Sequence, residues 1–172
     1  MRVKMLVLSI LALAVLSVAI AGIVAANDKS RFKTELTGYE ETPAVSSAGS
    51  GEFTATVDEE TQTIHYSLTF ANLNSNVLFA HVHFGQRGVA GGVAAFLCGG
   101  GSKPAPCLVG MPNTGTITPA DVIGPGPQGI AAGEWNELVA AIRAGVAYAN
   151  VHSTTQTGGE IRGQINDNDQ RN

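Results

Sequence analysis

The chain has 172 residues, a formal net charge of −4 at pH 7, 44% hydrophobic residues and 14% charged residues. This length fits one domain preceded by a targeting segment, and so apolar and weakly charged a composition excludes a disordered chain. The sequence has no stripe of basic residues of the kind that binds nucleic acid.

Residues 1–26 have the pattern of a targeting segment. Arg2 and Lys4 precede an apolar run over residues 5–20, and small residues follow at 24–26, which is typical of a secretory signal peptide. The apolar run is longer than in most signal peptides, so an uncleaved N-terminal membrane anchor is the alternative. In both cases the rest of the chain is expected to be secreted or otherwise extracytoplasmic.

Alternation of polar and apolar residues predicts short strands along most of the remaining chain. The clearest case is residues 63–71, where every second side chain from Ile64 to Phe70 is apolar. A polar turn precedes this run, so residues 56–70 are predicted to form a hairpin. The predicted strands cover residues 31–36, 51–57, 63–71, 78–84, 89–97, 115–117, 146–152 and 160–165.

One segment has the period of a helix instead. Apolar residues at positions i, i+3, i+4 and i+7 from Trp135 to Ile142 predict a helix over residues 134–144, which Gly145 is suited to end. About eight short strands with one late helix predict an all-β fold. We therefore expect an antiparallel, Greek-key-like β-sandwich with one short inserted helix.

The two cysteines, Cys98 and Cys107, flank a loop that is rich in Gly and Pro. In an oxidising compartment such a pair is expected to form a disulfide, which for a loop of this length stabilises the fold by about 2–3 kcal/mol. A pair of thiolate metal ligands is the alternative.

Several ordered motifs resemble a known family. They are LTGYEETP at residues 36–43, AHVHFG at 80–85, YANVH at 148–152 and GEIRGQ at 159–164. Together they make residues 32–165 resemble the CHRD domain, named for chordin, between a linker at 27–31 and a polar tail at 166–172. The resemblance implies a secreted or surface-exposed β-rich domain.

What the resemblance implies about function is limited. In chordin such domains repeat within an extracellular antagonist of growth factors, whereas single-domain microbial members are generally without an assigned function. This chain has one copy and lacks the cysteine-rich modules of chordin, so growth-factor binding does not carry over.

A shorter segment resembles copper–zinc superoxide dismutase. HVHFG at residues 81–85 is similar to a copper-ligand segment of that enzyme, and TGGEIR at 157–162 is similar to its C-terminal segment with Gly and Arg. The dismutases hold both metals with more histidines than the four of this chain and with an aspartate. A dismutase is therefore not expected.

The histidines are the candidate site. His81 and His83 lie two apart on a predicted strand, so both rings project from one face. If the strand that ends at His152 is a neighbour, three imidazoles meet, which suits copper or zinc, with water or the Glu160 carboxylate in a fourth position. The alternative is that these histidines bind backbone carbonyls or are exposed, as we expect for His65.

Arg162 lies two residues after Glu160 on the last predicted strand. It can orient a carboxylate or bind an anion through its planar fork. The alternative, which we favour, is a structural role, such as a surface ion pair worth about 0–1 kcal/mol. The sequence shows no Ser–His–Asp or Cys–His arrangement, so no residue is predicted to be catalytic.

Three functions of different classes are consistent with these residues. The first is an extracytoplasmic module that binds copper, or zinc, through His81, His83 and His152. The second is a non-catalytic structural or interaction domain with an extracellular or envelope protein as partner, and the third is a copper redox enzyme. None of them involves nucleic acid, and the membrane enters only through an uncleaved N-terminal segment.

Overall fold

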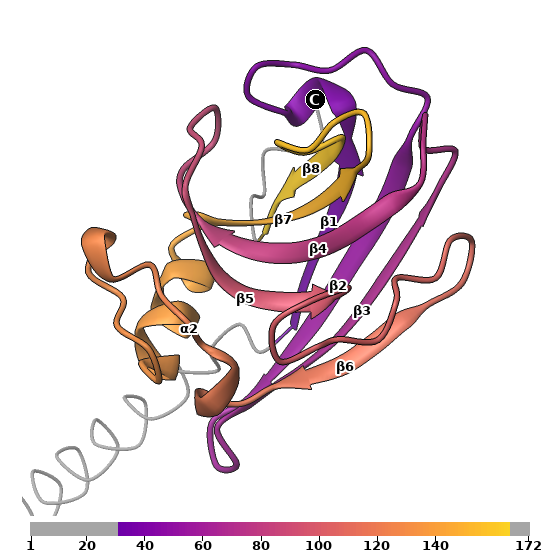
Figure 1. Ribbon diagram of the computed structural model, residues 1–172. Helices are drawn as coiled ribbons and strands as arrows, with labels where there is room; N and C mark the ends of the chain where they lie inside the picture. Colours follow the sequence, from indigo (N-terminus) through magenta and orange to yellow (C-terminus); the bar gives the residue numbers. More distant parts are fainter. Residues whose placement is uncertain (1–30, 166–172) are drawn as a thin grey trace, which may run out of the picture.

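Residues 31–165 of a computed structural model are described here, and they contain eight strands and one α-helix. The predicted targeting segment at 1–26, most of the linker and the tail at 166–172 lie outside the described residues. Among the described helices, none is long and apolar enough to cross a membrane. The strands are β1 (Arg31–Thr37), β2 (Ser50–Asp58), β3 (Thr63–Ala71), β4 (Val77–Phe84), β5 (Gly92–Cys98), β6 (Asn113–Ile117), β7 (Ala147–Ser153) and β8 (Ile161–Gln164) (Figure 1).

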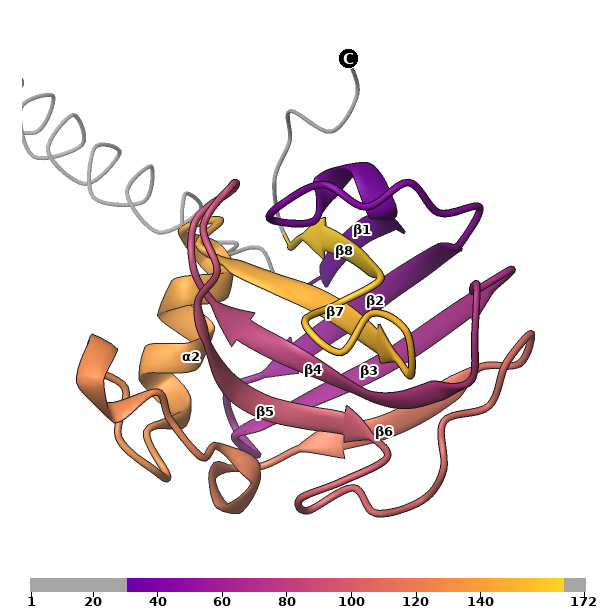
Figure 2. The same cartoon turned by 45° about the horizontal axis from the view of Figure 1, so that its top comes forward.

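The strands form one antiparallel sheet in the order β5-β4-β7-β8-β1-β2-β3-β6. The neighbours β3–β6, β4–β7 and β8–β1 are not consecutive in sequence, as in Greek-key connectivity. The sheet folds over so that β4, β5, β7 and β8 face β1, β2, β3 and β6, and its edge strands β5 and β6 come side by side (Figures 1 and 2). The predicted all-β fold with one inserted helix is confirmed.

The core lies between the two halves of this sheet. Alternate residues of β2 and β3 point into it, and Phe53 pairs with Leu68 across the two strands. Tyr66 of β3 spans the core and donates its hydroxyl proton to the Leu97 carbonyl of β5 at 2.7 Å. The predicted hairpin over residues 56–70 is confirmed, because period-two patterning places one face of each strand against the other half of the sheet.

Helix α2 (Trp135–Arg143) follows the predicted pattern and precedes β7. Its apolar stripe, from Trp135 to Ile142, is buried and packs near β7. The helix ends before Gly145, whose φ of 71° is a left-handed conformation that glycine adopts without a steric penalty. The predicted helix is confirmed, with its apolar stripe buried and its end just before Gly145.

Strands β7 and β8 are buried on both faces along their whole length, as are residues 80–83 of β4. Their inner face is apolar and joins the core, whereas their outer face is polar. Two loops cover that outer face, residues 38–49 before β2 and residues 85–91 between β4 and β5. This covered polar face contains the candidate site.

Candidate metal centre

Three histidines meet on the outer face of β4 and β7. These strands are direct neighbours, with His81 opposite Asn150 and Phe79 opposite His152. His81, His83 and His152 are each only 5–7% exposed, and one nitrogen of each lies within 4.8 Å of the others. Strands β4 and β7 are therefore neighbours, which was the condition for the three imidazoles to meet.

Backbone carbonyls fix the orientation of two of the rings. His83 contacts the Gly91 carbonyl through Nδ1 at 3.0 Å, and His152 contacts the Thr157 carbonyl through Nδ1 at 2.9 Å. A carbonyl only accepts, so each of these Nδ1 atoms carries the proton and each Nε2 is an unprotonated acceptor. Second-sphere contacts of this kind orient histidine ligands in metal sites.

Two of the four remaining ring nitrogens contact each other, and the other two have no hydrogen-bond partner in the described part of the chain. Nδ1 of His81 lies 3.2 Å from Nε2 of His152. Nε2 of His81 and Nε2 of His83 are buried and have no hydrogen-bond partner among the described residues. Buried polar atoms are nearly always paired, so these two nitrogens leave the group of three histidines with unshared donors that could bind a metal ion.

The cluster is held in its uncharged form. Burial lowers the pKa of His81 to about 3, and the neighbouring His152 and His83 lower it further. Burial also lowers the pKa of His83 to about 4 and shifts the pKa of His152 in the same direction. All three rings are therefore neutral at physiological pH, which is the form in which imidazole binds a metal.

Two phenylalanines flank the cluster. The ring of Phe79 lies 4.8 Å from those of His81 and His152, and Phe96 meets His81 edge to face at 4.4 Å. Gly100 and Gly101 pack against the Phe96 ring, where an added Cβ would approach within 2.7 and 2.4 Å of its carbons. The cluster is therefore surrounded by apolar rings on this side.

The loop that covers Phe96 is closed by the Cys98–Cys107 disulfide. The two sulfurs are bonded at 2.02 Å, which confirms the predicted disulfide and removes the alternative of two thiolate ligands. Lys103 of the same loop forms an ion pair with Asp121 at 2.6 Å. The disulfide and the ion pair hold the loop against Phe96, whose ring contacts His81.

A stack of three side chains flanks the cluster on the other side. The rings of His83 and Tyr148 are parallel, with 4.7 Å between their centroids and 5° between their planes. The guanidinium of Arg162 lies 3.4 Å from the centroid of the Tyr148 ring, a cation–π contact. His83 is thus held between the Gly91 carbonyl and the Tyr148 ring.

Arg162 is buried and hydrogen-bonded to loop carbonyls, and it does not form a surface ion pair. It is 2% exposed and donates to the carbonyls of Val89 at 2.9 Å and Gln86 at 3.0 Å. It also donates to Gln164 at 3.3 Å. These bonds fix the loop at residues 85–91, which carries the Gly91 carbonyl that orients His83.

Glu160 is not brought to the histidines. Its side chain is fully buried and accepts hydrogen bonds from the hydroxyl of Ser47 at 2.7 Å and from the backbone N–H of Asn74 at 2.6 Å. The group of candidate metal donors among the described residues contains the three histidines without it. Its carboxylate instead ties the 38–49 loop to the turn before β4, because both donors come from those segments.

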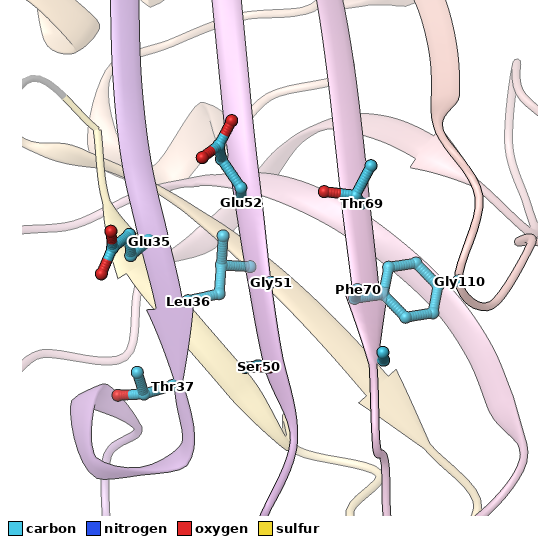
Figure 3. A pocket seen from close by; sticks show the side chains of 10 residues that line it. Glu35, Leu36, Thr37, Ser50, Gly51, Glu52, Thr69, Phe70 and Gly110 are labelled. Atoms are coloured by element: carbon cyan, nitrogen blue, oxygen red, sulfur yellow. The ribbon is translucent and has the colours of Figure 1, made fainter.

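His65 differs from the other histidines as expected. It is exposed on the outer face of β3, where its Nδ1 lies 3.0 Å from the hydroxyl of Thr116. A pocket of about 410 Å³ lies over the ends of β1, β2 and β3, away from the histidine cluster (Figure 3). Its carboxylates are Glu35 and Glu52, and Glu52 is paired with Lys33 at 2.6 Å, so it offers no comparable set of donors.

Comparison with protein families matches residues 32–165 to the CHRD domain. The chain belongs to the CHRD domain family. Comparisons with curated proteins and with solved structures gave no significant match. The local similarity to copper–zinc superoxide dismutase therefore has no support beyond the segments that suggested it, and the properties of the centre in this CHRD domain must be argued from its own geometry.

Several residues of the centre were not predicted from the sequence. Phe79 and Phe96 had no periodic or motif signal that distinguished them from core residues. The carbonyls of Gly91 and Thr157 belong to loops whose path the sequence does not specify. The glycine at position 91 is a feature of the sequence that could have indicated the path of this loop. An added Cβ there would lie 1.8 Å from the Phe84 carbonyl oxygen, so this close approach of the loop requires glycine.

Proposed function

We propose that this CHRD domain is an extracytoplasmic metal-binding module that holds one copper ion, with zinc second, through His81, His83 and His152. The observation that carries the proposal is the pair of buried, unpartnered nitrogens, Nε2 of His81 and Nε2 of His83. Leaving such atoms unpaired costs free energy, and a metal ion bound by the lone pairs would remove that cost.

The chemistry of the donors supports copper or zinc over harder ions. Three neutral imidazoles suit both metals, whereas magnesium and calcium prefer oxygen donors. Two of the rings are already oriented by carbonyls, so little ordering would accompany binding. Copper ranks ahead of zinc because it binds nitrogen donors more tightly in the order of divalent metals.

Export is part of this proposal. The apolar N-terminal run predicts a targeting segment, and the Cys98–Cys107 disulfide is typical of an oxidising compartment. Cell fractionation of the expressed chain tests this step. Recovery of the chain with a reduced Cys98 and Cys107 in the cytoplasm would contradict it.

Metal content tests the centre directly. The full chain, expressed without a His-tag, should contain near-stoichiometric copper or zinc by mass spectrometry. A triple variant with His81, His83 and His152 changed to Ala should lose it, and His65→Ala, which removes an exposed histidine, should retain it. A folded protein that is empty and refuses added copper would contradict the proposal.

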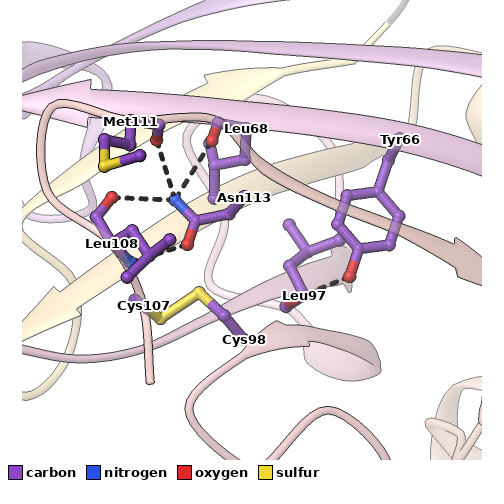
Figure 4. The surroundings of a disulfide bond; sticks show 8 residues. All are labelled: Tyr66, Leu68, Leu97, Cys98, Cys107, Leu108, Met111 and Asn113. Atoms are coloured by element: carbon purple, nitrogen blue, oxygen red, sulfur yellow. Dashed lines mark hydrogen bonds between the residues drawn. A yellow bond between two sulfur atoms is a disulfide. The ribbon is translucent and has the colours of Figure 1, made fainter. Parts of the chain in front are cut away.

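A second candidate function is protein interaction through an apolar loop. Leu108, Val109 and Met111 are 47–57% exposed. Asn113 holds their loop in one conformation by accepting from the Leu108 N–H at 2.7 Å and donating to the carbonyls of Leu108 and Met111, beside the disulfide (Figure 4). Ordered, exposed apolar residues of this kind are typical of contact surfaces.

Site-specific photo-crosslinking tests the second function. A crosslinker placed at Leu108 should capture one extracellular or envelope protein, whereas one placed at Thr69, on the outer face of β3, should not. Equal capture at both positions would contradict a specific surface.

A further inference from the structure

The charge of the bound ion can be inferred from the surroundings of the three histidines. All candidate donors are neutral imidazoles, and no carboxylate or thiolate of the described residues belongs to the group. An ion held there keeps its full positive charge inside the protein. Imidazole alone suits several metals, so the cost of burying that charge decides between them.

The carboxylates in this part of the molecule are committed to other partners, and Glu40 pairs with Arg87. Glu41 accepts a hydrogen bond from Asn150 and faces Arg162. Glu160 accepts from Ser47 and from the backbone of Asn74. None of them contributes an oxygen to the histidine group, so no anion within the donor set offsets the charge of a bound ion.

The remaining surroundings also disfavour a high positive charge. Phe79 and Phe96 place apolar rings against His81, which limits solvation of the ion. The guanidinium of Arg162 stacks on Tyr148, which in turn stacks on His83. A permanent positive charge therefore lies two ring layers from the centre and repels a divalent ion more than a monovalent one.

The energetic consequence follows from the dependence of solvation on charge. The Born cost of moving an ion out of water grows with the square of its charge, so it is about four times larger for a divalent than for a monovalent ion of similar radius. Resting on the proposed function, we propose that the centre of His81, His83 and His152 selects monovalent copper, Cu(I), over the divalent ions Cu(II) and Zn(II).

Affinity measurements on the full chain test this selection. Cu(I) is titrated without oxygen against the chromogenic chelator bicinchoninate, and Cu(II) and Zn(II) are titrated against chelators of known affinity. We expect the dissociation constant for Cu(I) to be the lowest of the three. Binding of Zn(II) or Cu(II) as tight as that of Cu(I) would overturn the selection and leave the proposed metal-binding function standing, whereas no binding of any of these ions would overturn both.

A matched pair of variants at Phe79 isolates the charge argument. Phe79 is partly exposed and contacts both His81 and His152, so a substitution there changes the cover without removing a ligand. Phe79→Asp places a negative charge beside the centre and should shift the preference toward divalent ions by about tenfold. Phe79→Leu keeps the cover apolar and should leave the preference unchanged. Equal shifts in both variants would overturn the argument from charge.

Discussion

Strands β3 and β7 show how one pattern gives two different surfaces. Both place apolar side chains into the core on one face and polar side chains on the other. On β3 the polar face is open to solvent, with His65 exposed, whereas on β7 the residues Tyr148, Asn150 and His152 are all buried. The difference arises because loops cover the outer face of β7 and leave that of β3 open.

Covering a polar face changes what its side chains must do. An exposed polar group is satisfied by water, but a buried one needs a partner within the protein. Most of the covered groups have such partners, as Arg162 and Asn150 show. Nε2 of His81 and Nε2 of His83 are distinguished from other buried atoms without a hydrogen-bond partner because they belong to one group of three candidate metal donors, and exposed His65 provides a control within the same molecule.

The largest expected effect is stabilisation of the folded protein by a metal ion bound to the three histidines on its covered face. A ligand that binds only the folded state at 1,000 times its dissociation constant raises the free energy of unfolding by about 4.1 kcal/mol. Copper should produce such a rise in the wild type and in His65→Ala, and none in His83→Ala. Urea unfolding followed by fluorescence of Trp135, the single tryptophan, measures it. Equal stabilisation of His83→Ala would show that copper acts elsewhere.

The next largest expected effect is the loss of folding stability when the guanidinium of Arg162 is removed. Arg162→Met removes hydrogen bonds to the carbonyls of Gln86 and Val89 and leaves these two acceptors of the covering loop without that donor. The free energy of unfolding should fall by about 3 kcal/mol, since each unsatisfied buried group costs roughly 1–3 kcal/mol.

The matched substitution on the open half is Ser67→Ala, at a partly exposed position of the outer face of β3. It should change the free energy of unfolding by less than about 0.5 kcal/mol, as most surface substitutions do. Urea unfolding of both variants without metal measures the contrast. Similar losses of unfolding free energy in Arg162→Met and Ser67→Ala would mean that the covering loop does not make the outer face of β8 more sensitive to substitution than that of β3.

Much of the fold could be predicted because its signals are local. The alternation in residues 63–71 and the stripe from Trp135 to Ile142 report which face each element buries, and both predictions were confirmed. Strand β5 begins at Gly92, later than the predicted start at residue 89. The reason is that residues 85–91 leave the sheet and fold over its outer face, which depends on contacts with Arg162 that are distant in sequence.

The candidate site could be predicted only in part for the same reason. The spacing of His81 and His83 is local, and it placed both rings on one face. The pairing of β4 with β7 and the cover by Phe79 and Phe96 are long-range facts. Glu160 shows the limit of local reasoning, because contacts with Ser47 and the Asn74 backbone, not its position just before β8, decide where its carboxylate points.

A smaller effect is expected from the disulfide that holds the loop over Phe96. Replacing Cys98 and Cys107 with Ser should lower the free energy of unfolding by about 2–3 kcal/mol, because the loop gains freedom in the unfolded chain. Metal affinity should also fall, since Gly100 and Gly101 would no longer be held against Phe96. Urea unfolding and copper titration of the double variant measure the two effects. Unchanged copper affinity would show that the loop is not part of the cover.

The smallest effect concerns Glu41, in the loop that covers β7 and β8. Burial raises the pKa of Glu41 from 4.5 to about 7, against the opposing effects of Arg162 and of the hydrogen bond from Asn150. The folded state therefore holds this proton more tightly than the unfolded chain, so the stabilisation is full below about pH 4.5 and is lost as the pH rises through 7.

Glu41→Gln keeps the side chain uncharged at every pH and tests this sign. Relative to the variant, the wild type should lose on the order of 1 kcal/mol of unfolding free energy between pH 5 and pH 8, a value reduced for the partial exposure of Glu41. Ser67→Ala, at the partly exposed position on β3, is the control on the open half and should follow the wild-type profile. Parallel profiles for wild type and Glu41→Gln would mean that the covering loop leaves Glu41 as well solvated as a carboxylate on the open face.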